Sequence, residues 1–230
     1  MRSMILPRLA GALLGTALVA GCNSNIVPDF VGAPVLIKLT GQSDISAEVA
    51  TVAGPYVFTV VDTGGKGVSG INVTFTITGP ATLVHTSAVT DQGGSVVASV
   101  QFGQTVGTVV ITAKADGITA PAVAHTFSFA APASRIVAVG GQGQQAPRGG
   151  PLEEQLVVAV TDQYNNPVPS ILVTFQPSAG IVGTPSGRTG VNGRVGTPYT
   201  FPATPGVQTI TASITLNGII TTVTFTVTGT

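Results

Sequence analysis

The chain repeats itself after about one hundred residues. The segment VVDTGGKGVSGINVTF at 60–75 aligns with VTDQYNNPVPSILVTF at 160–175, so that Asp62 falls on Asp162 and Phe75 on Phe175. Beyond a one-residue deletion the offset becomes 99, and GTVVITA at 107–113 then aligns with GVQTITA at 206–212. Repetition at a fixed spacing indicates one structural unit used twice. We therefore predict two tandem domains, at residues 34–131 and 134–230.

Apolar and polar residues alternate within each copy, as in strands that are buried on one face only. Ile71, Val73, Phe75 and Ile77 share one such face, and about seven similar runs per copy are separated by Gly, Pro, Asn and Asp. The pattern predicts an all-β fold of two tandem Ig-like antiparallel β-sandwich domains. The chain has no tryptophan and one cysteine, so the core of each sandwich must consist of aliphatic and phenylalanine side chains. The expected core phenylalanines are Phe58, Phe75, Phe102, Phe175 and Phe201.

Three motifs resemble the bacterial Ig-like domain group 1 repeats of invasin and intimin. They are AVTDQYNNPVPSILVTF at 159–175, the pairs Thr90-Asp91 and Thr189-Gly190 with their following glycines, and the GVQTITA or GTVVITA strand. The second copy matches better, because the first has Gly-Lys-Gly-Val-Ser at 65–69 where the family prefers Asn-Pro-Val-Pro. The resemblance implies a seven- to nine-stranded Ig-like sandwich that serves as a rod segment on the cell surface. It implies no catalytic residues.

The N-terminus predicts a lipoprotein signal peptide over residues 1–21. Residues 1–8 carry two positive charges, Arg2 and Arg8, and no acidic residue. An uncharged, mostly apolar run from Leu9 to Ala20 follows. This run is too short for a transmembrane helix, which needs about 20 residues. Val-Ala-Gly-Cys at 19–22 resembles the lipobox of bacterial lipoproteins, in which the cysteine is acylated and becomes the first residue. We expect Cys22 to carry lipid and residues 22–33 to form a tether; a chance cysteine after a plain signal peptide is the alternative.

Charge and composition limit the possible functions. Without residues 1–21 the chain keeps seven basic and nine acidic residues, so no basic surface favours a nucleic-acid partner. No combination of histidine, carboxylate and nucleophile suggests catalysis, and we predict no enzyme, cofactor or metal site. His125 alternates in register with Val123, Phe127 and Phe129, which places it on or beside the core face. His85 is expected in an exposed loop.

The remaining candidate residues lie in turns. Asp62 and Asp162 each follow a strand and open a Gly/Asn/Pro turn, where aspartate typically caps backbone N–H groups; a calcium site at the domain junction is the alternative. Tyr164, Asn165 and Asn166 form the possible interaction loop, with Tyr164 as the one aromatic side chain expected to be exposed. A tyrosine that packs on its own domain is the competing interpretation.

Three functions remain open. The favoured one is a non-enzymatic, lipid-anchored protein of the cell envelope, most simply of the outer membrane, that acts as a surface spacer or as an adhesion or interaction module. Its partner would be an envelope protein or a polysaccharide. The alternative is a carbohydrate-binding accessory lipoprotein, which needs exposed aromatic side chains on a flat sheet face. A hydrolase with a minimal site is the third.

Overall fold

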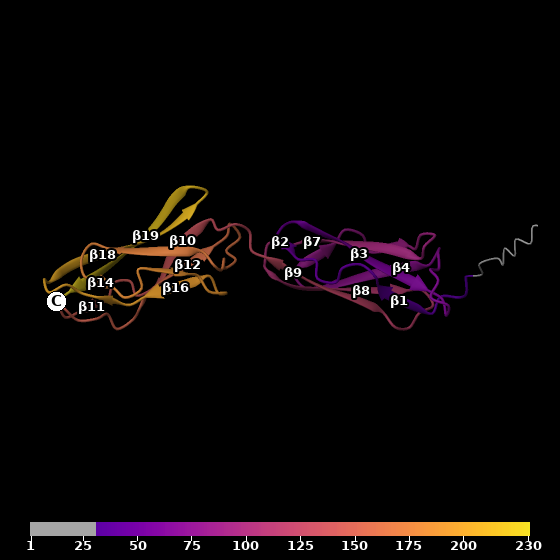
Figure 1. Cartoon of the computed structure of the whole chain (residues 1–230), viewed down its shortest axis with the longest axis horizontal. Helices are drawn as coiled ribbons and strands as arrows, with labels where there is room; N and C mark the ends of the chain where they lie inside the picture. The colour runs from indigo at the N-terminus through magenta and orange to yellow at the C-terminus, as the bar shows by residue number, and fades with distance from the viewer. Residues whose placement is uncertain (1–30) are drawn as a thin grey trace, which may run out of the picture. The chain divides into compact units, whose positions relative to one another are not determined.

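The computed structural model describes residues 31–230, which form one compact unit. The predicted signal peptide, Cys22 and most of the expected tether lie outside these residues. Every regular element between Val31 and Thr230 is a strand, so the prediction of an all-β fold is confirmed. Figure 1 shows the strands from indigo to yellow in chain order.

The first copy contributes nine strands. They are β1 (Leu36–Leu39), β2 (Ala47–Glu48), β3 (Val52–Val61), β4 (Asn72–Thr78), β5 (Ala81–Leu83), β6 (Ser87–Val89), β7 (Ser95–Phe102), β8 (Gly107–Ala115) and β9 (Ala122–Phe129). They form one sheet in the order β1-β3-β7-β5 and a second in the order β2-β9-β8-β4-β6. We call this pair of sheets sandwich one.

The second copy contributes ten strands. They are β10 (Arg135–Gly140), β11 (Gln145–Ala146), β12 (Leu156–Thr161), β13 (Leu172–Pro177), β14 (Ile181–Val182), β15 (Ser186–Arg188), β16 (Arg194–Thr197), β17 (Tyr199–Thr200), β18 (Gly206–Leu216) and β19 (Ile219–Gly229). The sheets are β10-β12-β16, the two-stranded β14-β17 and β11-β19-β18-β13-β15. This is sandwich two. Pro198 stands between β16 and β17, where sandwich one has the continuous strand β7.

No sheet combines strands from both copies, and each copy has its own cluster of buried apolar side chains. The antiparallel prediction needs one correction. In each sandwich the first two strands pair with different sheets. Strands β1 and β10 pair antiparallel with β3 and β12, respectively. Strands β2 and β11 run parallel to β9 and β19, respectively. These parallel strands have two residues each, too few for a periodic pattern to reveal them.

The predicted core phenylalanines are all buried, with exposed fractions between 0 and 3 %. Two tyrosines that the sequence pattern did not assign to the core are buried as well. The Tyr56 hydroxyl donates to the carbonyl of Ile45 at 3.0 Å, and the Tyr199 hydroxyl donates to that of Ala179 at 2.7 Å. Burial raises the pKa of both phenols. These bonds allow a polar group to lie in the interior without a lost hydrogen bond.

The prediction for β9 is wrong, because its faces are reversed. Val123, His125, Phe127 and Phe129 are exposed, whereas the small side chains between them are buried. The buried set is Ala122, Ala124, Thr126 and Ser128. Two of these are hydroxyl residues, and both bond to backbone carbonyls: Thr126 to Ile45, and Ser128 to Thr105 and Gly107. Small side chains on β9 leave space for the Tyr56 ring from the facing sheet, and the Tyr56 and Thr126 hydroxyls share the Ile45 carbonyl as acceptor.

Candidate interaction surfaces

The turn after β12 is organised around the carboxylate of Asp162, which is 1 % exposed. Its Oδ1 accepts the N–H groups of Tyr164 and Asn166, both at 2.8 Å. Its Oδ2 accepts the N–H of Ala131 at 3.0 Å and the Asn166 side-chain amide at 2.8 Å. One carboxylate thus shapes the turn and also holds the chain where it enters sandwich two. All four partners are N–H donors, which is the chemistry of capping.

The turn after β3 repeats this arrangement around Asp62. Its Oδ1 accepts the N–H groups of Gly64 and Lys66, and its Oδ2 accepts the N–H of Gly32 at 2.7 Å. Gly32 precedes sandwich one as Ala131 precedes sandwich two. These bonds, with that of Gly32 the largest contribution, hold the pKa of the Asp62 carboxyl below its ordinary value, because they stabilise the charged form.

The Asn166 side chain reaches from the turn of sandwich two to the β7–β8 loop. Its amide donates to the carbonyl of Gln104 at 2.7 Å, and its Oδ1 accepts the N–H of Val106 at 3.1 Å. With the bond to Asp162, three of its four hydrogen-bonding positions are used, and Asn166 is 5 % exposed. This member of the expected interaction loop therefore has a structural role within the chain.

The other two members of that loop differ from each other. Asn165 is exposed with a φ of 69°, a left-handed conformation that asparagine tolerates, and its Oδ1 accepts a bond from Arg135. Tyr164 is half-buried. The expectation that Tyr164 is the one exposed aromatic side chain is wrong, because Phe127 and Phe129 are 49 % and 47 % exposed.

Exposed apolar side chains gather on the outer face of β9. Val123, Phe127 and Phe129 are all at least 40 % exposed, and His125 lies between them on the same face. The neighbouring strand β8 places Val110 opposite His125 and Thr108 opposite Phe127. Sandwich one therefore has an apolar strip with two phenylalanine rings, bordered by threonines. We refer to Val123, His125, Phe127 and Phe129 as the β9 strip.

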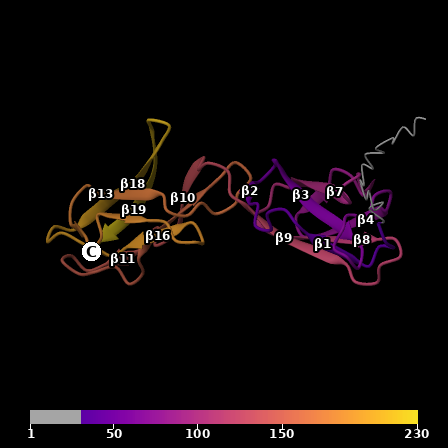
Figure 2. The same cartoon turned by 45° about the vertical axis from the view of Figure 1, so that its right-hand side comes forward.

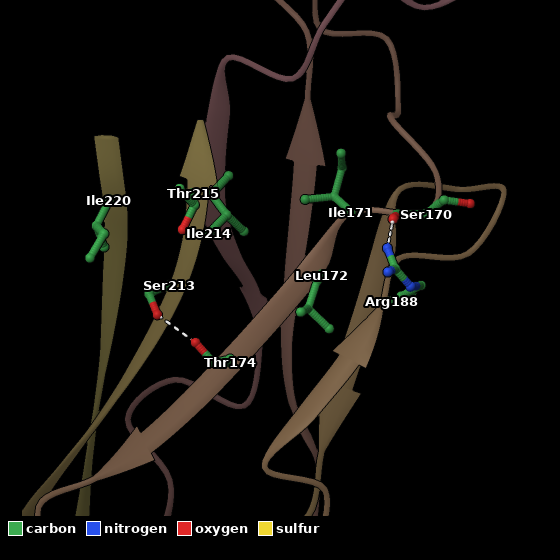
Figure 3. A pocket seen from close by; sticks show the side chains of 9 residues that line it. All are labelled: Ser170, Ile171, Leu172, Thr174, Arg188, Ser213, Ile214, Thr215 and Ile220. Carbon is green, nitrogen blue, oxygen red and sulfur yellow. Dashed lines mark hydrogen bonds between the residues drawn. The ribbon is translucent and has the colours of Figure 1, made fainter. Parts of the chain in front are cut away.

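A shallow hollow of about 360 Å³ lies on the outer face of sandwich two, over β13, β15, β18 and β19 (Figure 3). Its lining includes Leu172, Thr174, Arg188, Ser213 and Ile220. The Thr174 and Ser213 hydroxyls bond to each other at 2.7 Å, and Arg188 donates to the carbonyl of Ser170 at 2.6 Å. The polar groups of the hollow are thus engaged mainly with the protein itself.

Between Val31 and Thr230 no three His, Cys, Asp or Glu side chains lie close enough together to hold a metal ion. Over the same range no helix is long and apolar enough to cross a membrane.

No family model and no curated protein matches the chain. Among solved structures it is similar to the D0–D1 domain of Intimin, with 21 % identity over 84 % of this chain and 98 % of that chain and a TM-score of 0.35. It is also similar to FdeC, an adhesin of Escherichia coli, with 19 % identity over 84 % of this chain and 64 % of that chain and a TM-score of 0.45. The similarity to invasin, a bacterial integrin-binding protein, has 22 % identity over 81 % of this chain and 38 % of that chain and a TM-score of 0.40. Intimin and invasin are the proteins whose repeats the sequence motifs resemble.

Sequence reasoning included Thr90 and Thr189 in a family motif but assigned no role to either side chain. Thr90 and Thr189 are both 4 % exposed. The Thr90 hydroxyl donates to the carbonyl of Val68 and accepts the N–H of Ile71. The Thr189 hydroxyl does the same with Val168 and Ile171. Each threonine thus fastens the loop before β4 or β13. The repeat does contain a signal for this role, because both threonines occur at an offset of 99 just before a turn.

Proposed function

We propose that this chain is a non-enzymatic, lipid-anchored protein of the cell envelope, whose two sandwiches act as a surface spacer or as an adhesion or interaction module. Cys22 carries the lipid and residues 22–33 form the tether. The outer membrane is the proposed location. The partner is an envelope protein or a polysaccharide.

The observation that carries this proposal is the pair of aspartate turns. In both copies the best-connected carboxylate, Asp62 or Asp162, is used to fix the backbone at the entry to a sandwich. Asn166 then adds two bonds to the β7–β8 loop of the preceding copy. Polar groups used to hold sandwiches and their connection are what a spacer requires. The donors to both carboxylates are backbone N–H groups and the Asn166 side-chain amide.

Lipid attachment is tested by feeding labelled fatty acid to cells that produce the full chain. We expect label on the wild-type protein and none on Cys22→Ser, because no other cysteine occurs in the sequence. Cys22→Ser should also move from the membrane to the soluble fraction. Two acyl chains bind a membrane stably, since each buried CH₂ contributes about 0.8 kcal/mol. A wild-type protein without label would refute the anchor.

A carbohydrate-binding role is the second candidate, and the β9 strip favours it. Phe127 and Phe129 present two rings on one sheet face, beside the hydroxyl of Thr108. Aromatic faces and hydroxyl groups suit the apolar and polar sides of a sugar ring. A pull-down with envelope polysaccharides tests this role: Phe127→Ala/Phe129→Ala should abolish binding, whereas Thr76→Ala on the same sheet should retain it. No binding by the wild-type protein would exclude this candidate.

A further inference from the structure

The outer edge of β19 carries unpaired backbone groups over its first half. Thr226 and Thr228 point away from β18, because they exchange hydrogen bonds with Gln142, Gly143 and Gln144. Backbone direction alternates along a strand, so Ile220, Thr222 and Thr224 point the same way. The parallel strand β11 pairs only with Thr228 and Gly229. Within the described residues, no strand pairs with the edge from Ile220 to Thr224.

Other sheet edges in the two sandwiches carry features that discourage pairing. Charged residues occur on the edge strands β1, β10, β15 and β16, as Lys38, Arg135, Arg188 and Arg194. Strand β10 also has a register shift, and β5, β6 and β14 have two or three residues each. Charges, irregularities and shortness are the usual means by which proteins prevent edge-to-edge association.

Strand β19 has none of these features. It is 11 residues long, and the sequence from Thr215 to Thr230 contains no charged residue and no proline. Ile220 is 69 % exposed. In Figure 1 and Figure 2 the β18–β19 hairpin, in yellow, extends past the other strands of its own sandwich. Figure 3 shows Ile220 on the outermost strand of those beside the hollow.

The equivalent edge in sandwich one is closed by a proline. Ala113 pairs with Ala122 in the first copy, and its counterpart Ala212 pairs with Val223 in the second. Ala122 and Val223 are therefore equivalent positions. The residues just before them, Pro121 and Thr222, are equivalent as well. Proline has no N–H, so sandwich one cannot donate a hydrogen bond where sandwich two can.

We propose that β19 is a dimerisation edge, on which the β19 strand of a second copy of this chain pairs antiparallel. With Thr222 opposite Thr222 of the second copy, Ile220 lies opposite Thr224, and the outward N–H and C=O groups of all three residues find partners. The two strands have the same sequence and no charge, so no like-charge repulsion opposes the pairing. The opposed side chains are β-branched, which favours cross-strand packing. A twofold contact of this kind closes as a dimer.

Sedimentation of residues 31–230 over a range of concentrations tests the proposal. We expect a monomer–dimer equilibrium. Thr222→Pro should weaken dimerisation about tenfold or more, because the edge loses its central donors, while its outward position leaves the β18 pairing intact. Thr222→Val is the matched control, since it keeps the N–H and the branched shape, and it should dimerise like the wild type. Circular dichroism checks that both variants keep the fold.

A cysteine scan tests the register, because residues 31–230 contain no native cysteine. Thr222→Cys should form a disulfide-linked dimer on mild oxidation, since its two copies face each other at a Cα distance that a disulfide can span. Thr224→Cys is also at an exposed position, but it faces Ile220 and should remain uncrosslinked. A wild-type monomer at the highest soluble concentration, a Thr222→Pro variant that dimerises normally, or crosslinking of Thr224→Cys in place of Thr222→Cys would each overturn the proposal.

Discussion

The two sandwiches share a backbone plan but place their large aromatic side chains differently. Phe75 and Phe175 are equivalent, as are Phe102 and Phe201. Sandwich one places its two further buried rings on β3, at Tyr56 and Phe58, where sandwich two has Leu156 and Val158. Sandwich two places its additional rings at Tyr199 on β17 and Phe225 on β19. Each sandwich thus has four buried rings, so the repeat preserves their number more strictly than their positions.

The rings shared by both copies should give the largest effects. Phe175 is 3 % exposed, and we expect Phe175→Ala to cost about 3–5 kcal/mol of unfolding free energy through lost burial and a cavity. Phe75→Ala should cost a similar amount in sandwich one. Urea denaturation of residues 31–230 measures both. Thr174→Ala, on the exposed face of the same strand, is the control, and a loss equal to that of Phe175→Ala would mean that the faces are wrongly assigned.

The aspartate turns should give the next largest effect, and an unequal one. The carboxylate of Asp162 accepts four hydrogen bonds and that of Asp62 three. Asp162→Ala leaves buried donors without partners and should cost about 2–3 kcal/mol. Asp62→Ala should cost less, because its turn is more open to water. Thermal unfolding of the two variants gives the order, and a greater loss for Asp62→Ala would show that the Asn166 contacts do not strengthen the second turn.

Because the two copies place their buried rings differently, a second substitution should compensate for the destabilisation caused by a first. Ala124 pairs with Ile111 as Phe225 pairs with Ile210, so Ala124 occupies the place of Phe225. Ala124→Phe should overpack sandwich one and cost about 1–3 kcal/mol. Tyr56→Leu in the same chain reproduces the second copy's combination and should restore part of the loss, as chemical denaturation of the single and double variants would show. Additive losses would mean that the two positions do not share space.

The sequence predicted most of the interior, because the residues of β4 and β18 alternate between apolar side chains on one face and mainly threonine on the other. It failed at β9, where Val123, Phe127 and Phe129 are outside and Thr126 is inside. Hydrophobicity alone could not reveal this reversal, because it depends on the Tyr56 ring, which comes from a strand about seventy residues earlier.

The turn residues illustrate the same limit. The positions of Asp62 and Asp162 were sufficient to predict capping of the local turn. The bonds to Gly32 and Ala131 involve residues about thirty positions earlier, and those from Asn166 reach Gln104 and Val106. Contacts across such separations are set by the packing of sheets, which a local motif does not encode.

The smallest expected effect is a pH dependence that depends on Asp62. Its pKa is lower in the folded protein than in the unfolded chain, so the folded state binds the proton less readily. The resulting stability is present above the unfolded pKa of about 3.9 and is lost as the pH falls through the folded pKa. Unfolding measured from neutral to acidic pH should show this loss in the wild type and a shallower loss in Asp62→Asn. Identical profiles would contradict the role of the Gly32 bond.

Separate expression of the two copies tests whether one unit of about one hundred residues folds twice along this chain. Residues 34–131 and 134–230 each contain all the sheets of one sandwich and the buried residues of its apolar cluster. We expect each to give dispersed amide signals by NMR and one cooperative unfolding transition, since a domain of this size buries enough surface to fold alone. If either copy is unfolded by itself but folded when joined to the other, the account of two independent sandwiches is contradicted.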